Sequence, residues 1–305
     1  MKTAAIVSAL AAIGATAIPT AYPIYKRATA AGAPTNTQVL QYALTLENLE
    51  NTLYMEALSQ FSDADFTAAG YPDWVRGRYE EISMHETAHV ELLSSSLGNM
   101  SVAPCNYSFP YTDVKSFVSL ATVIENVGVS AYAGAAQYIT SAEYLTVAAV
   151  ILSTEARHQA WQMSAVAQEN PWSSPYDTPL GLDMVYTIAS QFITSCPSSN
   201  AALPVKAFPA LTIATGNPGD NVAFTFTDSH TAVNYAIFYN GLGTSVQALD
   251  ANDMATIPEG LQGYTYVLIS TASSAADVTN DNIVAGPAIL DYPFAYNVAN
   301  PSFSG

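Results

Sequence analysis

The chain has 305 residues, of which 50% are hydrophobic and only 11% are charged. This composition can fill two folded cores, and it excludes a disordered chain, which would be poor in aromatic residues. The formal net charge is −17. Nucleic acid is therefore a poor candidate partner, because binding it requires basic patches that neutralise phosphate.

The N-terminal segment, residues 1–21, is typical of a secretory signal peptide. An apolar run from Ala4 to Ile18 follows a short basic start and ends in small residues, and it is too short for a membrane span. Residues 22–34 form a propeptide or linker. The pair Lys26-Arg27 in it resembles a fungal processing site, and the alternative is an incidental basic pair.

Removal of residues 1–27 by the expected processing would change the net charge of the protein. Residues 1–27 contain three basic residues and no acidic one, so the 8 basic residues become 5 against 25 acidic ones, and the net charge becomes −20. Such a charge favours solubility and attracts cations. No later segment is expected to be long and apolar enough to span a bilayer, so we expect a secreted protein or one of the cell wall.

Four long segments carry apolar residues at intervals of three and four, the period of an amphipathic helix. Pro72 suits a first helical position, Gly98 suits a C-terminal cap, and Thr140-Ser-Ala-Glu143 has the pattern of a capping box. A shorter helix is expected from about Leu182 to Ile193. The long helices are expected from about Asn36 to Phe61, from Pro72 to Leu97, from Asp113 to Tyr138, and from Thr140 to just before Pro171.

From about Ala201 the pattern changes to short runs rich in β-branched and aromatic residues, separated by Gly, Asn, Asp and Pro. Asn240-Gly241 is a plausible tight turn between two of these runs. Regular short strands of this kind indicate an antiparallel β-sandwich of immunoglobulin or fibronectin type. We therefore expect a helical bundle over residues 35–196 and a β-sandwich over residues 197–305.

Two Glu-x-x-His pairs stand on two of the expected helices. They are Glu86-Thr-Ala-His89 and Glu155-Ala-Arg-His158, and they use two of the four histidines of the chain. A separation of three places both side chains on one helix face, so that a carboxylate and an imidazole can bind one metal together. One pair occurs by chance on many surfaces, whereas two pairs on two long helices favour a metal site.

The other two helices each offer an acid. Glu125 stands in an otherwise apolar stretch, and a buried carboxylate is costly unless it is paired or binds a metal. The first helix offers both Glu47 and Glu50, and spacing does not choose between them. One of these two is the ligand and the other a neighbouring partner, or Glu50 pairs with Arg157 or Arg78.

The positions of these acids agree with one site. Each acid falls close to the middle of a helix of about 25 residues, roughly 37 Å long, so that packed helices bring all of them to one level. Four carboxylates and two neutral imidazoles balance two divalent ions. Without metal, these carboxylates would have to take up protons or admit water.

Cys105 and Cys196 are the only cysteines, and an even pair in an oxidising compartment usually forms a disulfide. Two glycosylation sequons begin at Asn99 and Asn106 and flank Cys105. Their clustering indicates one exposed loop.

The stretches Ala43-Leu-Thr-Leu-Glu47-Asn-Leu-Glu50, His85-Glu86-Thr-Ala-His89-Val90, Glu125-Asn-Val-Gly-Val-Ser-Ala-Tyr132 and Glu155-Ala-Arg-His158 resemble the secreted ferritin-like domain family. That family includes fungal stress-response and late sexual development proteins and plant desiccation-related proteins. The resemblance covers about residues 35–195. It implies a multidomain α and β protein, with a ferritin-like four-helix bundle, a fifth helix and a C-terminal antiparallel β-sandwich.

The resemblance also implies a ligand set for two Fe or two Mn ions. Carried over residue by residue, the ligands are Glu47, Glu86, His89, Glu125, Glu155 and His158. His85 has no counterpart among the usual ligands and is expected beside the site or on the surface, paired with Glu81. A ferritin cage does not carry over easily, because the β-domain obstructs a shell.

Two functions follow as hypotheses. In the first, the chain is an oxidoreductase, an oxidase or a catalase-like enzyme, that reacts with dioxygen or peroxide in a stress- or development-related role. In the second, it is a non-enzymatic stress or cell-wall protein, whose metal site is structural or scavenging and whose β-domain binds an extracellular partner. The ligands do not choose between Fe and Mn.

Overall fold

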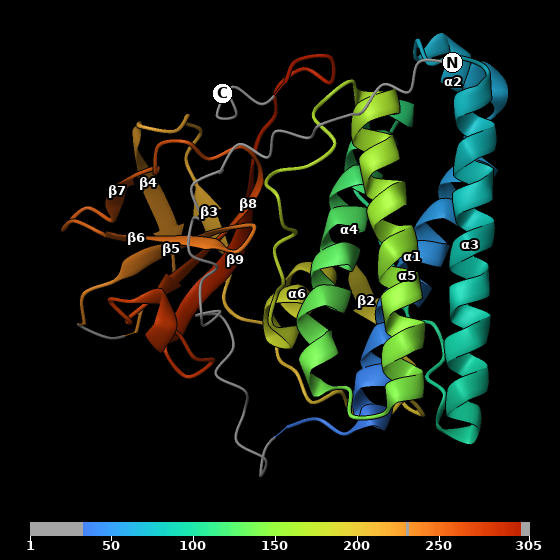
Figure 1. Cartoon of the computed structure of the whole chain (residues 1–305), viewed down its shortest axis with the longest axis horizontal. Coiled ribbons are helices and arrows are strands. Elements are labelled where there is room, and N and C mark those ends of the chain that lie inside the picture. Colours follow the sequence, from blue (N-terminus) through green and yellow to red (C-terminus); the bar gives the residue numbers. More distant parts are fainter. Residues whose placement is uncertain (1–32, 230–231, 300–305) are drawn as a thin grey trace, which may run out of the picture.

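The computed structural model describes residues 33–229 and 232–299. A helical bundle and a group of β-sheets lie side by side, as Figure 1 shows. The expected signal peptide and the dibasic pair Lys26-Arg27 lie outside the described residues. The statements below concern the described part of the chain.

The bundle has the four long helices that the periodicity predicts. The N-terminal helix packs on the next long helix and on the third, and the third packs on the fourth. A long crossover, residues 98–113, joins the second to the third (Figure 1), as in ferritin-like bundles. The helices are α1 Asn36–Gln60, α3 Trp74–Leu97, α4 Val114–Ala135 and α5 Ala142–Trp161, with a short α2 Asp63–Ala68 between the first two.

The helix starts differ from the sequence expectation at two places. Pro72, expected at a first helical position, lies before α3, whose N-cap is Asp73. Ser141, and not Thr140, is the N-cap of α5, where its side chain accepts a hydrogen bond from the Tyr144 N–H. Thr140 is instead bonded to Asn36 at the start of α1, with its N–H donating to Asn36 Oδ1 at 2.9 Å. The expected capping box is therefore wrong, because Thr140 connects two helices. Gly98 caps α3 as predicted, with φ of 56°.

The end of the helical region is less regular than expected. After Trp161 the chain continues as a π-helical turn, Gln162–Ala167. The helix α6, Leu182–Ala189, ends before Ile193. The residues that follow form strand β2, Ile193–Ser195, which pairs with β1, Asn106–Tyr107, from the crossover. This pairing shortens the expected fifth helix.

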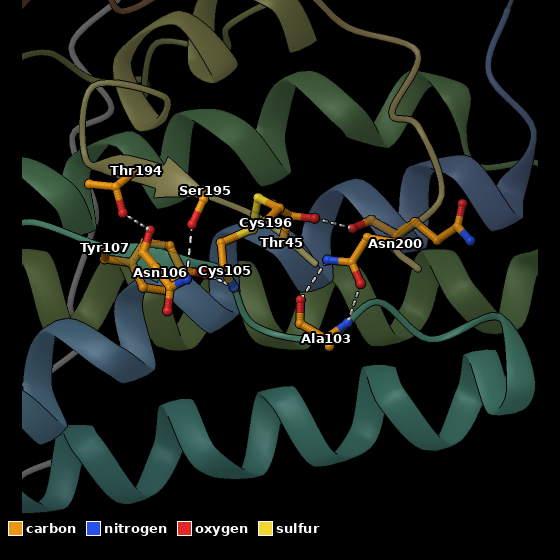
Figure 2. The surroundings of a disulfide bond; sticks show 10 residues. Thr45, Ala103, Cys105, Asn106, Tyr107, Thr194, Ser195, Cys196 and Asn200 are labelled. Carbon is orange, nitrogen blue, oxygen red and sulfur yellow. Dashed lines mark hydrogen bonds between the residues drawn. A yellow bond between two sulfur atoms is a disulfide. The ribbon is translucent and has the colours of Figure 1, made fainter. Parts of the chain in front are cut away.

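The predicted disulfide is confirmed and joins these two segments. Cys105 is bonded to Cys196, 91 residues later. Figure 2 shows the polar contacts around it: Asn200 both donates to and accepts from the backbone of Ala103, and Asn106 Nδ2 donates to Ser195 Oγ at 2.9 Å. Asn99 and Asn106 are both exposed, as sequons require, and their glycosylation stays a prediction.

Removing this disulfide is expected to lower the free energy of unfolding. The Cys105→Ser, Cys196→Ser double variant no longer constrains a loop of 91 residues in the unfolded chain, a constraint worth up to about 5 kcal/mol in the chain-entropy model. Urea unfolding of both proteins measures the difference, and added reductant should shift the midpoint of the wild type only. An unchanged midpoint in the double variant would contradict the prediction.

The C-terminal region is built from antiparallel sheets. A three-stranded sheet has the order β3-β4-β7 and a four-stranded sheet has the order β6-β5-β8-β9. Asn240-Gly241 begins the tight connection between β5 and β6, and Gly241 has φ of 59°. The strands are β3 Leu211–Ile213, β4 Asn221–Phe226, β5 Tyr235–Asn240, β6 Gly243–Ala248, β7 Met254–Thr256, β8 Gly263–Ser270 and β9 Ile283–Tyr292.

The central strands of the four-stranded sheet, β5 and β8, are buried on both faces. Along β8, Val267 and Ile269 belong to the core between the two sheets, whereas Tyr266 and Leu268 belong to the core of the bundle. Alternate side chains of a strand point to opposite faces, so one strand contributes to both cores. Tyr266 also reaches α4, where its hydroxyl accepts a hydrogen bond from Asn126 Nδ2 at 2.9 Å. The immunoglobulin or fibronectin assignment stays a prediction.

One helix is long and apolar enough to cross a membrane by length and composition, although no such segment was expected from the sequence. Of the described residues, Val114–Tyr138 form the single helical stretch long and apolar enough to cross a membrane by length and composition. The corresponding window is 67% buried inside the protein, as in the core helix of a bundle. The described chain therefore contains no clear membrane span.

Candidate metal centre

The six residues of the expected ligand set meet in the middle of the bundle. The four carboxylate residues are completely buried, and the two histidines are 8% and 5% exposed. Each long helix contributes at least one side chain: Glu47 from α1, Glu86 and His89 from α3, Glu125 from α4, Glu155 and His158 from α5. The sequence separation of three places the histidine of each pair one turn after its glutamate.

These side chains form two overlapping groups of possible ligand atoms. Glu47 and His89 belong to one group, Glu125 and His158 belong to the other, and Glu86 and Glu155 belong to both. Within each group all the ligand atoms lie within 4.8 Å of one another. Each group could therefore hold a metal ion, and two of the carboxylates belong to both groups.

The imidazoles face this shared space through Nδ1. His89 Nδ1 lies 3.2 Å from Glu47 Oε2, 3.2 Å from Glu86 Oε2 and 3.1 Å from Glu155 Oε1. His158 Nδ1 lies 3.2 Å from Glu86 Oε1 and 3.4 Å from Glu125 Oε2. Each of these ring nitrogens therefore lies close to carboxylate oxygens from at least two helices.

Several polar atoms of this cluster are buried and lack a hydrogen-bond partner. They include both carboxylate oxygens of Glu155, one oxygen each of Glu47, Glu86 and Glu125, and His158 Nδ1. Buried polar atoms in a folded protein are normally satisfied, and oxygen with imidazole ligands suits Fe and Mn. The residues present therefore fit a bound metal cation.

The comparison with known proteins agrees with this geometry. Residues 35–168 match the family described as the ferritin-like domain. The helical region is a ferritin-like domain. Protein rds1 of Schizosaccharomyces pombe is 27% identical to the chain over 174 residues, which are 57% of this chain and 43% of rds1. The chain thus matches less than half of the length of that relative. The family resemblance and the fold class expected from the sequence are confirmed.

Burial changes the protonation of the ferritin-like domain's carboxyl groups. Burial and the neighbouring carboxylates hold the pKa of Glu155 and of Glu50 well above the ordinary value. Burial also raises the pKa of Glu47 to about 7, although His89 opposes the rise. For Glu86, burial acts in the same direction, but the close contacts of its carboxylate with the imidazoles of His158 and His89 outweigh it and lower the pKa to about 2.

The pKa values of the two histidines in the cluster are raised, although burial by itself lowers the pKa of a base. Burial alone would lower the pKa of His89, but Glu155, Glu47 and Glu86 outweigh it and raise the pKa to about 12. The pKa of His158 rises to about 9, because Glu125 and Glu86 outweigh burial. Without metal, the cluster therefore holds several protons in the place where cations would supply the positive charge.

Two tyrosines donate hydrogen bonds across the bundle of the ferritin-like domain. They orient the two carboxylates that belong to only one group of ligand atoms each. The hydroxyl of Tyr54 on α1 donates to Glu125 on α4, and the hydroxyl of Tyr132 on α4 donates to Glu47 on α1. Burial holds the pKa of both phenols well above the ordinary value, so both remain donors. Gln162, in the π-helical turn after α5, donates to Tyr54 at 2.8 Å and to Glu125 at 3.3 Å.

Sequence reasoning missed these three residues, although a signal was present. Each tyrosine stands seven residues after the glutamate of its own helix: Tyr54 after Glu47 and Tyr132 after Glu125. Seven residues are two turns, so both side chains lie on the same face. Gln162 has no comparable signal, because its position depends on the π-helical turn.

The structure separates the two acids of α1. Glu47 lies in a group of ligand atoms and Glu50 does not. Glu50 is still buried, at 3% exposure, beside Gly128 of α4, where a Cβ would lie 2.7 Å from Glu50 Oε1. Neither expected arginine pairs with it.

The remaining candidates lie at the edge of the cluster. Arg78 pairs with Glu81 at 2.5 Å, and Arg157 is exposed and donates to Thr154. His85 is exposed, and its Nδ1 lies 2.9 Å from His158 Nε2. The expected pairing of His85 with Glu81 is therefore replaced by this contact, because Arg78 takes the Glu81 carboxylate.

Proposed function

We propose that the ferritin-like domain holds two Fe or two Mn ions and reacts with dioxygen or peroxide. The observation that carries the proposal is the pair of overlapping ligand groups that share Glu86 and Glu155. Glu47 and His89 would complete the ligand set of one ion, and Glu125 and His158 would complete that of the other. Bound Fe or Mn would supply reversible changes of oxidation state.

The residues of the protein would hold the ions in three ways. The four buried glutamates balance the charge of two divalent ions and hold them in a dry core. Tyr54 and Tyr132 fix the orientation of one oxygen of Glu125 and of Glu47, leaving the other oxygen of each for the metal. Neighbours that orient ligands in this way raise both affinity and activity.

A secreted location is part of the proposal. The disulfide supports an oxidising compartment, and the expected signal peptide and the exposed sequons point to the same route. The resemblance to secreted stress-response proteins supports a stress- or development-related role outside the cell.

The second candidate is a non-enzymatic stress or cell-wall protein, in which the metal is structural or scavenged and the β-domain binds an extracellular partner. The observation that favours it is the crowding of five buried glutamates in the core, Glu50 included. Cations relieve that crowding whether or not they react. Metal binding would then add to the free energy of folding.

Peroxide consumption and oxygen uptake by the metal-loaded protein distinguish the two candidates. We expect the wild type to consume peroxide or dioxygen, and the Glu125→Ala variant to do so at least about tenfold more slowly. Equal rates for both proteins, with equal metal content, would support the structural candidate. Absence of bound transition metal after reconstitution with either Fe or Mn would overturn both.

A further inference from the structure

We propose that a cavity between α3 and α5 is a binding site for a small aromatic monocarboxylate. The cavity has a volume of about 330 Å³, at the lower end of the range for small-molecule sites. Two tryptophans, two arginines and two histidines line it: Trp74, Arg78 and His85 from α3, and Arg157, His158 and Trp161 from α5.

The charge of this cavity matches one carboxylate. Arg78 and Arg157 line it together with a single acid, Glu81, which Arg78 already pairs at 2.5 Å. Arg157 is exposed, and its guanidinium donates a hydrogen bond to the hydroxyl of Thr154 at 3.0 Å. Within residues 33–229 and 232–299 it forms no ion pair with a carboxylate. One guanidinium is thus available in a protein with a net charge of −17. A guanidinium binds a carboxylate with two parallel hydrogen bonds.

The walls of the cavity match an aromatic ring. Trp74 and Trp161 lie 6.2 Å apart between ring centroids, with their planes at 62°. Trp74 is 45% exposed, which leaves part of its ring open to a ligand. The two rings pack edge to face and form one aromatic wall, and a flat ring laid against this wall would gain edge-to-face or stacked contacts. A polyphosphate does not fit, because the cavity offers one unpaired cation.

The cavity leads towards the proposed metal centre. His158 lines it and directs Nδ1 at Glu86 and Glu125, while its Nε2 contacts His85 at 2.9 Å. A ligand bound at Arg157, one residue before His158, is therefore close to the reactive cluster. Binding at Arg157 does not require metal, whereas a role of the ligand as substrate rests on the proposed function.

Isothermal titration calorimetry with 4-hydroxybenzoate tests the site in the full chain, both metal-loaded and metal-free. We expect binding to both forms, with about tenfold weaker binding by Arg157→Gln, since a charge-assisted hydrogen bond is lost. The uncharged analogue 4-hydroxybenzamide should bind at least about tenfold more weakly than the acid. Trp74→Leu should also weaken binding, and it removes an exposed side chain, so the fold is retained.

Lys206→Gln is the matched control, because it removes one positive charge at an exposed position outside the cavity. Its affinity should stay within about twofold of the wild type. Equal affinity of Arg157→Gln and wild type, equal affinity for acid and amide, or no binding of the acid to either form would overturn the site. Binding only to the metal-loaded protein would also overturn it, since the carboxylate would then be a metal ligand. Failure of metal binding alone would overturn the proposed function and leave this site standing.

Discussion

Replacing Glu86 with glutamine is expected to abolish binding of both metal ions, whereas replacing Glu47 or Glu125 is expected to leave one. The reason is that Glu86 belongs to both groups of ligand atoms, while Glu47 and Glu125 belong to one each. Metal content per chain after reconstitution with Mn or Fe measures this directly. We expect about two ions in the wild type, about one in Glu47→Gln and Glu125→Gln, and near none in Glu86→Gln.

Glu155→Gln should behave like Glu86→Gln, because Glu155 is the second shared residue. Glu56→Gln is the control: it removes an exposed acid from α1 and should leave the metal content unchanged. Each Glu→Gln change keeps the shape of the side chain and removes a charge from a crowded cluster, so the fold is expected to survive. Retention of two ions by Glu86→Gln would refute the shared arrangement.

The metal-free protein is expected to lose stability as the pH rises from about 4.5 to 7.5. Burial raises the pKa of Glu47 from 4.5 to about 7, so the folded chain binds this proton more tightly than the unfolded chain. The resulting stabilisation is complete below 4.5 and is lost as the pH rises through about 7. A rise of the pKa from 4.5 to about 7 corresponds to up to about 3 kcal/mol.

The other pKa shifts in the cluster do not reverse this loss of stability with rising pH. Glu155 and Glu50, whose pKa values are also raised, act in the same direction. His89 adds to the loss above pH 6.5, because its pKa of about 12 exceeds the unfolded value of 6.5. Glu86, with a pKa lowered to about 2, contributes stability that is complete above 4.5 and is lost only in stronger acid.

Urea unfolding at several pH values, with and without metal, measures how the free energy of unfolding changes with pH. Glu47→Gln should be more stable than wild type at pH 7.5 without metal, by up to about 3 kcal/mol, and about equal to it at pH 4.5. Bound metal should reverse the order, because it requires deprotonated ligands and stabilises the fold by about 3 kcal/mol per site at a hundredfold excess over Kd. A metal-free stability that rises with pH between these values would contradict the charge crowding.

The sequence predicted the helices of the bundle because their apolar residues recur with a helical period over long segments. The same reasoning predicted the Glu-x-x-His pairs, since residues three apart on a helix are neighbours in any fold. The fifth helix and the cap of α5 were predicted less well. In both places a contact with a distant segment decided the outcome: β2 pairs with β1, and Thr140 binds Asn36.

The first-helix acid illustrates the limit of local patterns. Glu47 and Glu50 lie within the same apolar arc, and both are buried. Only the packing of α1 against α3 and α4 places Glu47 at His89 and Glu50 at Gly128. The contacts of Tyr54 with Glu125 and of Tyr132 with Glu47 also join different helices.

The sequence by itself determined which residue types could form a metal centre, on which helices and on which faces, because helical periodicity is local. The tertiary structure decided which carboxylates are shared between the two groups, since that depends on distances between helices. It also decided that β8 contributes to two cores and that Arg157 lines a cavity beside His158. Those arrangements come from packing between segments distant in sequence, which no local pattern encodes.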